Sequence, residues 1–262
     1  MKEIILIVLG IVLVGTILMV AYERGQKLVE DKSYWVKRNA LLHDTLYTML
    51  RQTRELFEKY KLVYWISDGT LLGAVRGKRI IYYDDDMDVS LFDDDHFRTV
   101  LPMMTRDLQK MGYIVKLHQM MYIYQIIDPN TGANLDWFLY DPKPHVEDET
   151  GRTFYHNNTW VIRTMAPYTK IYHDELYPLK QYSFGPTCHN DNEVNNLYWG
   201  PGNPWTYLVR NYKEDFYKVG KITHCHQSAS MWDTFCVWLG GGSKIVEMDP
   251  DDVACALSFK TR

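Results

Sequence analysis

Four aspartates lie close together near the first third of the chain. They are Asp84, Asp85, Asp86 and Asp88. Carboxylates this close repel one another, and in a folded core they are unfavourable unless a cation neutralises them or water reaches them. A solvated acidic loop is the ordinary interpretation of such a run. Apolar and aromatic residues flank this one on both sides, however, which favours a location inside the fold.

The segment Asp86-Met87-Asp88-Val89 alternates between acidic and apolar residues. On a β-strand, alternate side chains share a face, so Asp86 and Asp88 are predicted to lie side by side. Two such carboxylates form a chelating pair for a hard cation such as Mg²⁺ or Mn²⁺. Asp85 is predicted to point to the opposite face and to matter less. From these residues alone, a metal site and a solvated loop remain equally open.

A third carboxylate, Asp136, lies in the later apolar segment 134–138. A lone acid in such a strand is usually an edge or surface residue. Together with Asp86 and Asp88 it would complete a three-carboxylate site for one or two metal ions. Sites of that kind hold the attacking and leaving oxygens in phosphoryl transfer.

Groups that can bind phosphate precede the acidic run. Gly69 and Thr70 form a turn at the predicted start of a helix, where backbone N–H groups and a hydroxyl can face an anion. Arg76 and Lys78 follow, and either side chain can neutralise phosphate. A solvated basic turn is the alternative for these two cations.

Helices and short strands are predicted to position these side chains. Apolar residues recur at spacings of three and four over 38–60 and over 94–111, which indicates two helices that pack one face on a core. Apolar, β-prone runs bounded by turn residues indicate strands. The predicted strands are 62–66, 86–91, 113–117, 121–127 and 133–140, with a short helix at 70–76 and a turn at 128–132. Beyond residue 141 we expect irregular structure and short strands over one side of the sheet.

Composition indicates a globular protein. The chain has 262 residues, of which 46% are hydrophobic and 24% charged, enough for one sizeable domain with a core. Its formal net charge of −4 argues against a nucleic-acid-binding protein, which usually carries a basic excess.

The N-terminus begins with an apolar run, Ile4–Val20, flanked by charges. Its length predicts a transmembrane anchor over residues 1–22, and a cleaved signal peptide is the alternative. Residues 23–37 are predicted to form a stalk, and 38–262 the catalytic domain, with a core at 62–140. Positive charge is balanced at the two ends of the run, so the positive-inside rule does not decide the orientation.

Four cysteines lie in the last third of the chain: Cys188, Cys225, Cys236 and Cys255. Two disulfides in an oxidising lumen and four buried thiols are both open interpretations. Zinc binding with the neighbouring histidines is a less favoured third. One glycosylation sequon begins at Asn157.

Two blocks of sequence together carry a family resemblance. Residues 68–76 (DGTLLGAVR) followed by 84–89 (DDDMDV) resemble the signature of the LicD/fukutin family. The resemblance implies an α+β fold, with a nucleotidyltransferase-like mixed sheet flanked by helices. A looser similarity extends to 195–200, where Trp199 separates the tyrosine and glycine of the family's motif.

The resemblance also implies a function. Members of this family transfer phosphocholine or a phospho-alditol from a CDP-linked donor to a glycan. The implied ligands of Mg²⁺ or Mn²⁺ are Asp86, Asp88 and Asp136. Either Asp84 or Asp136 is implied as the base that accepts the acceptor proton.

The implied contacts to donor phosphate come from Gly69, Thr70 and Arg76, with Lys78 nearby. Two other functions remain open: a nucleotidyltransferase that makes an activated donor, and a non-catalytic glycan-binding or scaffold protein. With the predicted anchor, the expected location is that of a type II membrane protein with its domain in the ER or Golgi lumen. A cytosolic-facing domain is the alternative.

Overall fold

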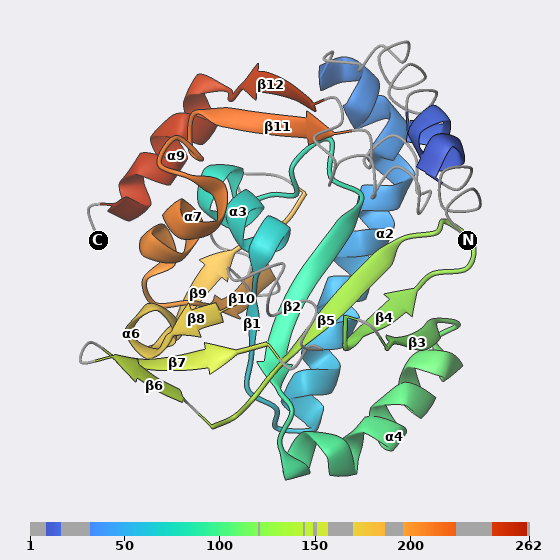
Figure 1. Ribbon diagram of the computed structural model, residues 1–262. Helices are drawn as coiled ribbons and strands as arrows, with labels where there is room; N and C mark the ends of the chain where they lie inside the picture. Colours follow the sequence, from blue (N-terminus) through green and yellow to red (C-terminus); the bar gives the residue numbers. More distant parts are fainter. Residues whose placement is uncertain are drawn as a thin grey trace.

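A five-stranded mixed sheet forms the centre of the computed structural model (Figure 1). Its order is β1-β2-β5-β4-β3. The strands are β1 (Tyr64–Ile66), β2 (Asp86–Phe92), β3 (Ile114–His118), β4 (Ile123–Ile127) and β5 (Asn134–Tyr140). The structure describes residues 9–16, 32–119, 121–143, 145–148, 151–156, 170–186, 196–223 and 243–260. All five strands, and the α+β class, agree with the sequence predictions.

Strands β2 and β5 run parallel at the middle of the sheet, and the other pairs are antiparallel. Each central strand has one apolar face, because its side chains alternate between the two faces. The fully buried residues of that face are Met87, Val89, Leu91, Leu135, Trp137 and Leu139. The opposite face of both strands carries the aspartates. The alternation of side chains along β2 and β5 therefore places apolar residues in the core and the aspartates on the polar face of the sheet.

Helix α2 (Lys32–Lys59) covers the apolar face. Its buried residues recur at helical spacing and reach the sheet through Phe57, whose ring centroid lies 5.1 Å from that of Trp137. The helix begins earlier than predicted. Residues 32–37, assigned above to a stalk, form its first turns, and Trp35 is fully buried. A stalk is therefore wrong for 32–37, and 23–31 lie outside the described residues.

Two shorter helices frame the acidic strand. Helix α3 (Asp68–Gly77) lies in the connection from β1 to β2 and ends where Lys78 adopts a left-handed conformation with φ of 55°. Helix α4 (Asp95–Lys110) follows β2, and the carboxylate of Asp94 caps it by accepting the Phe97 N–H at 2.7 Å. Both helices were predicted to within two residues at each end.

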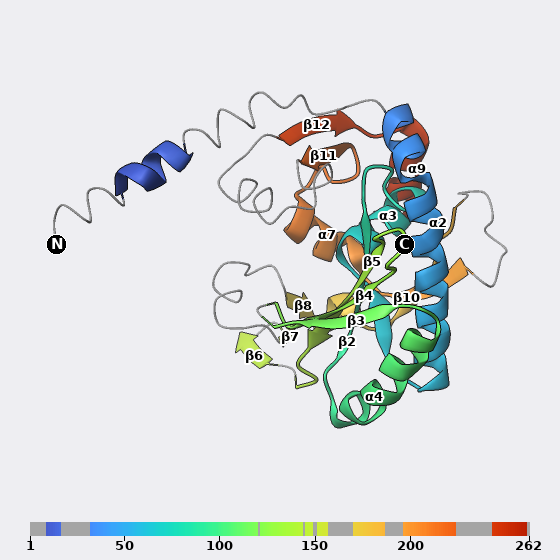
Figure 2. The ribbon, with the colours of Figure 1, turned by 90° about the vertical axis from the view of Figure 1, so that its right-hand side faces the viewer.

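The C-terminal part forms small sheets and helices. Figure 2 shows helix α7 and the β11–β12 hairpin on the side of the central sheet that is opposite α2. The strands are β6 (His145–Asp148), β7 (Gly151–Tyr155), β8 (Lys170–Tyr172), β9 (Lys180–Ser183), β10 (Leu197–Gly200), β11 (Val219–Thr223) and β12 (Ser243–Glu247). The helices are α6 (His173–Leu176), α7 (Pro204–Tyr212) and α9 (Pro250–Lys260). The sequence prediction had the short strands but missed helices α7 and α9, although a proline at the first position of each is a helix-start signal.

The predicted transmembrane helix is not confirmed. Of the apolar N-terminal run, the structure describes a helix over 9–16. Within the described part of the chain, no helix combines the length and apolar character needed to cross a membrane. Three of the four cysteines (Cys188, Cys225 and Cys236) and the sequon at Asn157 lie outside the described residues, so the disulfide and zinc interpretations stay predictions.

Replacing Trp35 by alanine tests whether the first turns of α2 belong to the folded domain. The side chain is 0% exposed, so its removal should lower the free energy of unfolding by about 3–5 kcal/mol. Leu41 on the same helix is 69% exposed, and Leu41→Ala should change it by less than about 0.5 kcal/mol. Chemical denaturation measures both. Equally small effects would contradict the packing of this segment.

Candidate active site

Three aspartates from two strands converge on the polar face of the sheet. The parallel register pairs Asp88 of β2 with Asp136 of β5, and Asp86 lies two residues before Asp88 on the same face. One carboxylate oxygen from each of the three lies within 4.8 Å of the others. The structure thus brings together the three residues that the sequence singled out, although they come from segments about fifty residues apart.

The turn before helix α3 holds Asp88 in place. The Gly69 N–H donates to Asp88 Oδ2 at 2.9 Å, and the Asp88 N–H donates to Thr70 Oγ1 at 2.7 Å. The Ser67 N–H donates to the Asp88 carbonyl at 3.2 Å. Backbone and side chain of one aspartate are therefore fixed by a single turn. Gly69 and Thr70 were predicted to bind phosphate, and in the structure these groups position Asp88.

Close packing against two carboxylates explains why this turn has a glycine at position 69. A Cβ atom built at this position would lie 2.9 Å from Asp84 Oδ2 and 3.2 Å from Asp88 Oδ2. Carbon and oxygen rarely approach this closely, so any side chain here would push the carboxylates apart. The absence of a side chain is what allows the helix to approach the acidic strand.

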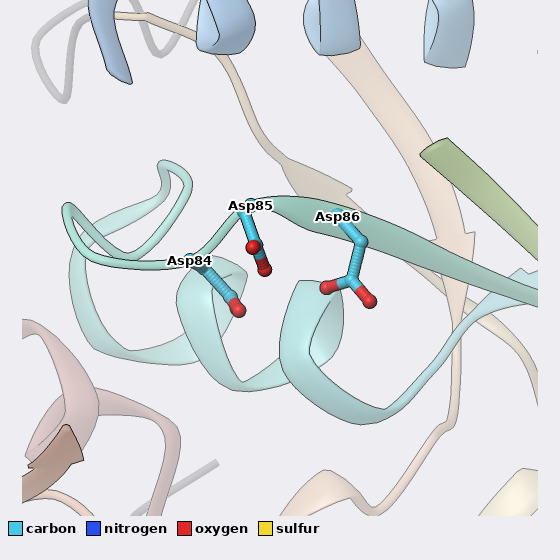
Figure 3. Close-up of side chains that lie close together, drawn as sticks. All are labelled: Asp84, Asp85 and Asp86. Atoms are coloured by element: carbon cyan, nitrogen blue, oxygen red, sulfur yellow. The ribbon is translucent and has the colours of Figure 1, made fainter. Parts of the chain in front are cut away.

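A second group of carboxylates precedes the first. One carboxylate oxygen from each of Asp84, Asp85 and Asp86 also lies within 4.8 Å of the others. Figure 3 shows the three side chains leaving the chain on the same side, toward helix α3. The prediction that Asp85 points to the opposite face is wrong. Strand β2 begins only at Asp86, so the alternation of a strand does not apply to Asp85.

Helix α2 anchors the backbone at Asp84. His43 Nε2 donates to the Asp84 carbonyl at 2.8 Å, and Asn39 Nδ2 donates to the Tyr82 carbonyl at 3.3 Å. These contacts connect a core helix to the loop that leads into β2. The predicted acid Asp84 is 9% exposed, so it lies inside the site.

Neighbours on β4 and β5 orient Asp136. Its Oδ1 accepts hydrogen bonds from Asn134 Nδ2 at 2.6 Å and from Gln125 Nε2 at 3.3 Å. Both amides favour the charged carboxylate, but burial dominates and raises the pKa of Asp136 to about 6.

Burial and mutual repulsion also raise the pKa of the other two acids. For Asp88, burial is the larger cause and the charge of Asp86 the next. For Asp86, burial comes first and the charge of Asp84 next. Nearby carboxylates disfavour each other's ionised form, and a bound cation would reverse this effect. The cluster therefore has the electrostatics of a site that gains from positive charge.

Asp68 is a further acid of the site that the sequence analysis did not assign a role. Its backbone has a φ of 42°, which is unusual for a residue other than glycine. Its Oδ1 accepts a hydrogen bond from the Tyr207 hydroxyl of α7 at 2.7 Å, and burial raises its pKa. Its place directly before Gly69 in the motif was the signal available in the sequence.

Four of the acids, Asp68, Asp84, Asp86 and Asp88, line a cavity of about 720 Å³, here called the acidic cavity. Asp136 is not among the described residues that line it. One wall consists of α3 and the start of β2. The other wall is C-terminal, and its residues are Asn211, Tyr212, Lys213, Asp215, Val219, Gly220 and Ile245. The volume is in the range of small-molecule sites.

Arg76 joins the two walls. It lines the acidic cavity and is 3% exposed. Its Nε donates to the Phe216 carbonyl and its Nη2 to the Val219 carbonyl, both at 2.7 Å. Within the described part of the chain, its Nη1 has no hydrogen-bond partner. Lys78, the other predicted phosphate ligand, is not among the described residues that line this cavity.

Comparison with known proteins shows a family model that matches the part of the chain carrying the aspartates. Residues 61–189 match the model described as LicD/FKTN/FKRP, nucleotidyltransferase domain. An uncharacterized protein of Rickettsia typhi is 35% identical over 172 residues, which are 65% of this chain and 46% of the relative. An uncharacterized protein of Rickettsia prowazekii matches with the same identity and covers 54% of that relative. The chain thus spans about half the length of these relatives.

A shorter match involves a protein with a named activity. The lipopolysaccharide cholinephosphotransferase LicD of Haemophilus influenzae is 47% identical over 45 residues, which are 17% of each chain.

Asp136→Asn tests the electrostatic state of the site. In the unfolded chain this carboxyl loses its proton near 3.8, whereas the folded protein keeps it to about 6. The folded state binds more protons between these values, so its stability falls as pH rises through them. The asparagine variant has no carboxyl at this position to titrate, so it does not lose stability in this way. It should be more stable than wild type by about 1–3 kcal/mol at about pH 7.5, and equal to it at about pH 3.

Denaturation in EDTA at both pH values measures this difference, with Glu55→Gln, an exposed carboxylate on α2, as the control. A stability difference between Asp136→Asn and wild type that does not change with pH would contradict the raised pKa.

Proposed function

We propose that this chain, whose residues 61–189 belong to the LicD/FKTN/FKRP nucleotidyltransferase family, is a metal-dependent phosphotransferase. It moves a phosphocholine, phospho-alditol or phospho-sugar group from a CDP-linked donor to a glycan, forming a phosphodiester. The observation that carries the proposal is the convergence of Asp86, Asp88 and Asp136 within 4.8 Å, inside the residues that match the family. The activity named for the Haemophilus relative supports the choice of a phosphate-linked head group.

The donor set suits Mg²⁺ or Mn²⁺. Both are hard cations that prefer carboxylate oxygens, and the three acids offer such oxygens from a rigid pair of strands. Asp86 belongs to both carboxylate groups, so it can bridge two ions. When bound, the cation would neutralise the diphosphate oxygens of the donor.

Besides the cation, the reaction requires a group that accepts the proton of the acceptor hydroxyl, and the chain supplies it. The oxygen of the acceptor hydroxyl bonds to the phosphorus that carries the head group, the bond from that phosphorus to the bridging oxygen breaks, and CMP leaves. The hydroxyl proton passes to a carboxylate, Asp136 or Asp84. Of the two, Asp84 lines the acidic cavity, where it can meet the acceptor hydroxyl.

Arg76 is placed to hold a donor phosphate through its Nη1. The rest of the guanidinium is fixed by the carbonyls of Phe216 and Val219, so the group is oriented before the donor arrives. Pre-orientation of this kind lowers the entropic cost of binding.

Asp88→Asn tests the proposal. The amide keeps the shape of the side chain and can still accept the Gly69 N–H, so the variant should fold and melt like wild type or slightly above it. It loses a charged ligand and should release CMP from CDP-choline or CDP-ribitol with Mn²⁺ at least about a hundredfold more slowly. Full activity would contradict the proposed site. Pyrophosphate as the product, in place of CMP, would identify a nucleotidyltransferase.

Cation binding should depend on pH. Protons and the cation compete for the same oxygens, and burial raises the pKa of Asp136 to about 6. At about pH 5 that carboxyl is mostly protonated, so Mn²⁺ should bind about tenfold more weakly than at about pH 7.5. Calorimetric titration of the wild-type chain at the two pH values measures this ratio. Equal affinities, or no binding at either pH, would contradict the three-aspartate site.

A further inference from the structure

A groove follows helix α7 away from the acidic cavity. The C-terminal end of α7 forms part of the cavity wall, and Asp215 lines both that cavity and a neighbouring one of about 700 Å³. Trp205 and Thr206, at the start of α7, line this second cavity and also a third of about 590 Å³. Neighbouring hollows therefore share lining residues along α7, which is about 14 Å long, and together they are here called the groove.

Aromatic rings form the apolar surface of this groove. The ring of Trp205 lies 5.4 Å from that of Tyr217 and 4.9 Å from that of Phe216. At the far end, the rings of Tyr182 and Phe259 stack at 5.6 Å with an interplanar angle of 8°. Both Trp205 and Tyr217 are only half-buried, so part of each ring is available to a ligand.

The charges that line the groove nearly balance. Glu214 and Asp215 are exposed on its rim. The guanidinium of Arg210 is engaged by Glu175, with Nη2 and Oε2 2.7 Å apart. Lys218 of the second cavity, whose ammonium lies over the Tyr217 ring, and Lys180 of the third cavity balance the two carboxylates. The groove therefore offers no net attraction to an anionic donor, whereas the hydroxyls of a neutral ligand can donate to the two carboxylates.

We propose that the groove along α7 binds the acceptor as a neutral saccharide chain, with sugar rings packed on Trp205 and Tyr217 and hydroxyls held by Glu214 and Asp215. This rests on the proposed function, since it assigns the acceptor of that reaction to a place. Asp215 then lies where the saccharide enters the acidic cavity. Arg76 fixes the wall between the two hollows through the Phe216 and Val219 carbonyls.

The test is direct binding of the full chain to an array of immobilised neutral oligosaccharides, with basic peptides on the same array. Wild type should bind at least one saccharide, and Trp205→Ala should weaken that binding at least about tenfold. Trp199→Ala is the matched control, because Trp199 is 39% exposed and lies on β10 outside the groove. Asp88→Asn should bind saccharide like wild type, because it alters the cation site and not the groove.

Glu214→Ala separates binding from folding. Glu214 is exposed and Trp205 packs on Phe216, so the glutamate variant keeps the aromatic packing and should melt like wild type. It should weaken saccharide binding about fivefold, as expected for one lost hydrogen bond. Capture of no saccharide, preference for the basic peptides, or equal effects of the Trp205 and Trp199 variants would overturn the assignment. CMP release by wild type, measured separately, decides the proposed function independently.

Discussion

The concentration of carboxylates at the start of β2 is the constraint on which the rest of the site depends. Buried like charges oppose folding, and here burial and neighbouring charges raise the pKa of Asp86 and Asp88 together. Two features of the fold hold the charges in place. The parallel pairing of β2 and β5 fixes Asp88 beside Asp136, and the turn before α3 fixes Asp88 through Gly69 and Thr70. Under the proposed function, a bound cation would neutralise the charge that these contacts leave unbalanced.

The C-terminal part of the chain encloses this concentration of carboxylates. The chain after β5 contributes one wall of the acidic cavity, and Arg76 connects that wall to α3 through two backbone carbonyls. Tyr207 of α7 makes a second connection, to Asp68. Helix α7 is thus fixed against the acids at one end and bounds the groove with its outward face. Donor and acceptor sites would then share one wall, which suits the transfer of a group between two ligands.

Much of the central sheet follows from local patterns. The alternation of Asp86-Met87-Asp88-Val89 predicted a strand with paired acids, and the apolar spacing of 38–60 predicted helix α2. The two motif blocks resemble the LicD/fukutin family, and the match of residues 61–189 to the model of that family confirms the resemblance. The convergence of Asp136 with Asp88 depends on a parallel strand register that no local pattern encodes. The sequence offered Asp136 as a third carboxylate in an apolar strand, and the motif resemblance then implied the same residue.

Other features depended on tertiary contacts and were missed. Trp35 lies in a polar segment that looked like a stalk, yet packing buries it completely. Asp85 was misplaced because the alternation was extended to a residue that precedes the strand, which begins at Asp86. The roles of Arg76 and Asp68 depend on Phe216, Val219 and Tyr207, which are about 140 residues away in the sequence. Contacts of this range cannot be read from spacing.

The central claim is that Asp86, Asp88 and Asp136 form one cation site. Anomalous diffraction from crystals of the chain grown with Mn²⁺ tests it most directly. The account predicts a peak within about 2.0–2.3 Å of a carboxylate oxygen from each of the three residues. No peak at that position, in a crystal where the three side chains are ordered, would contradict it.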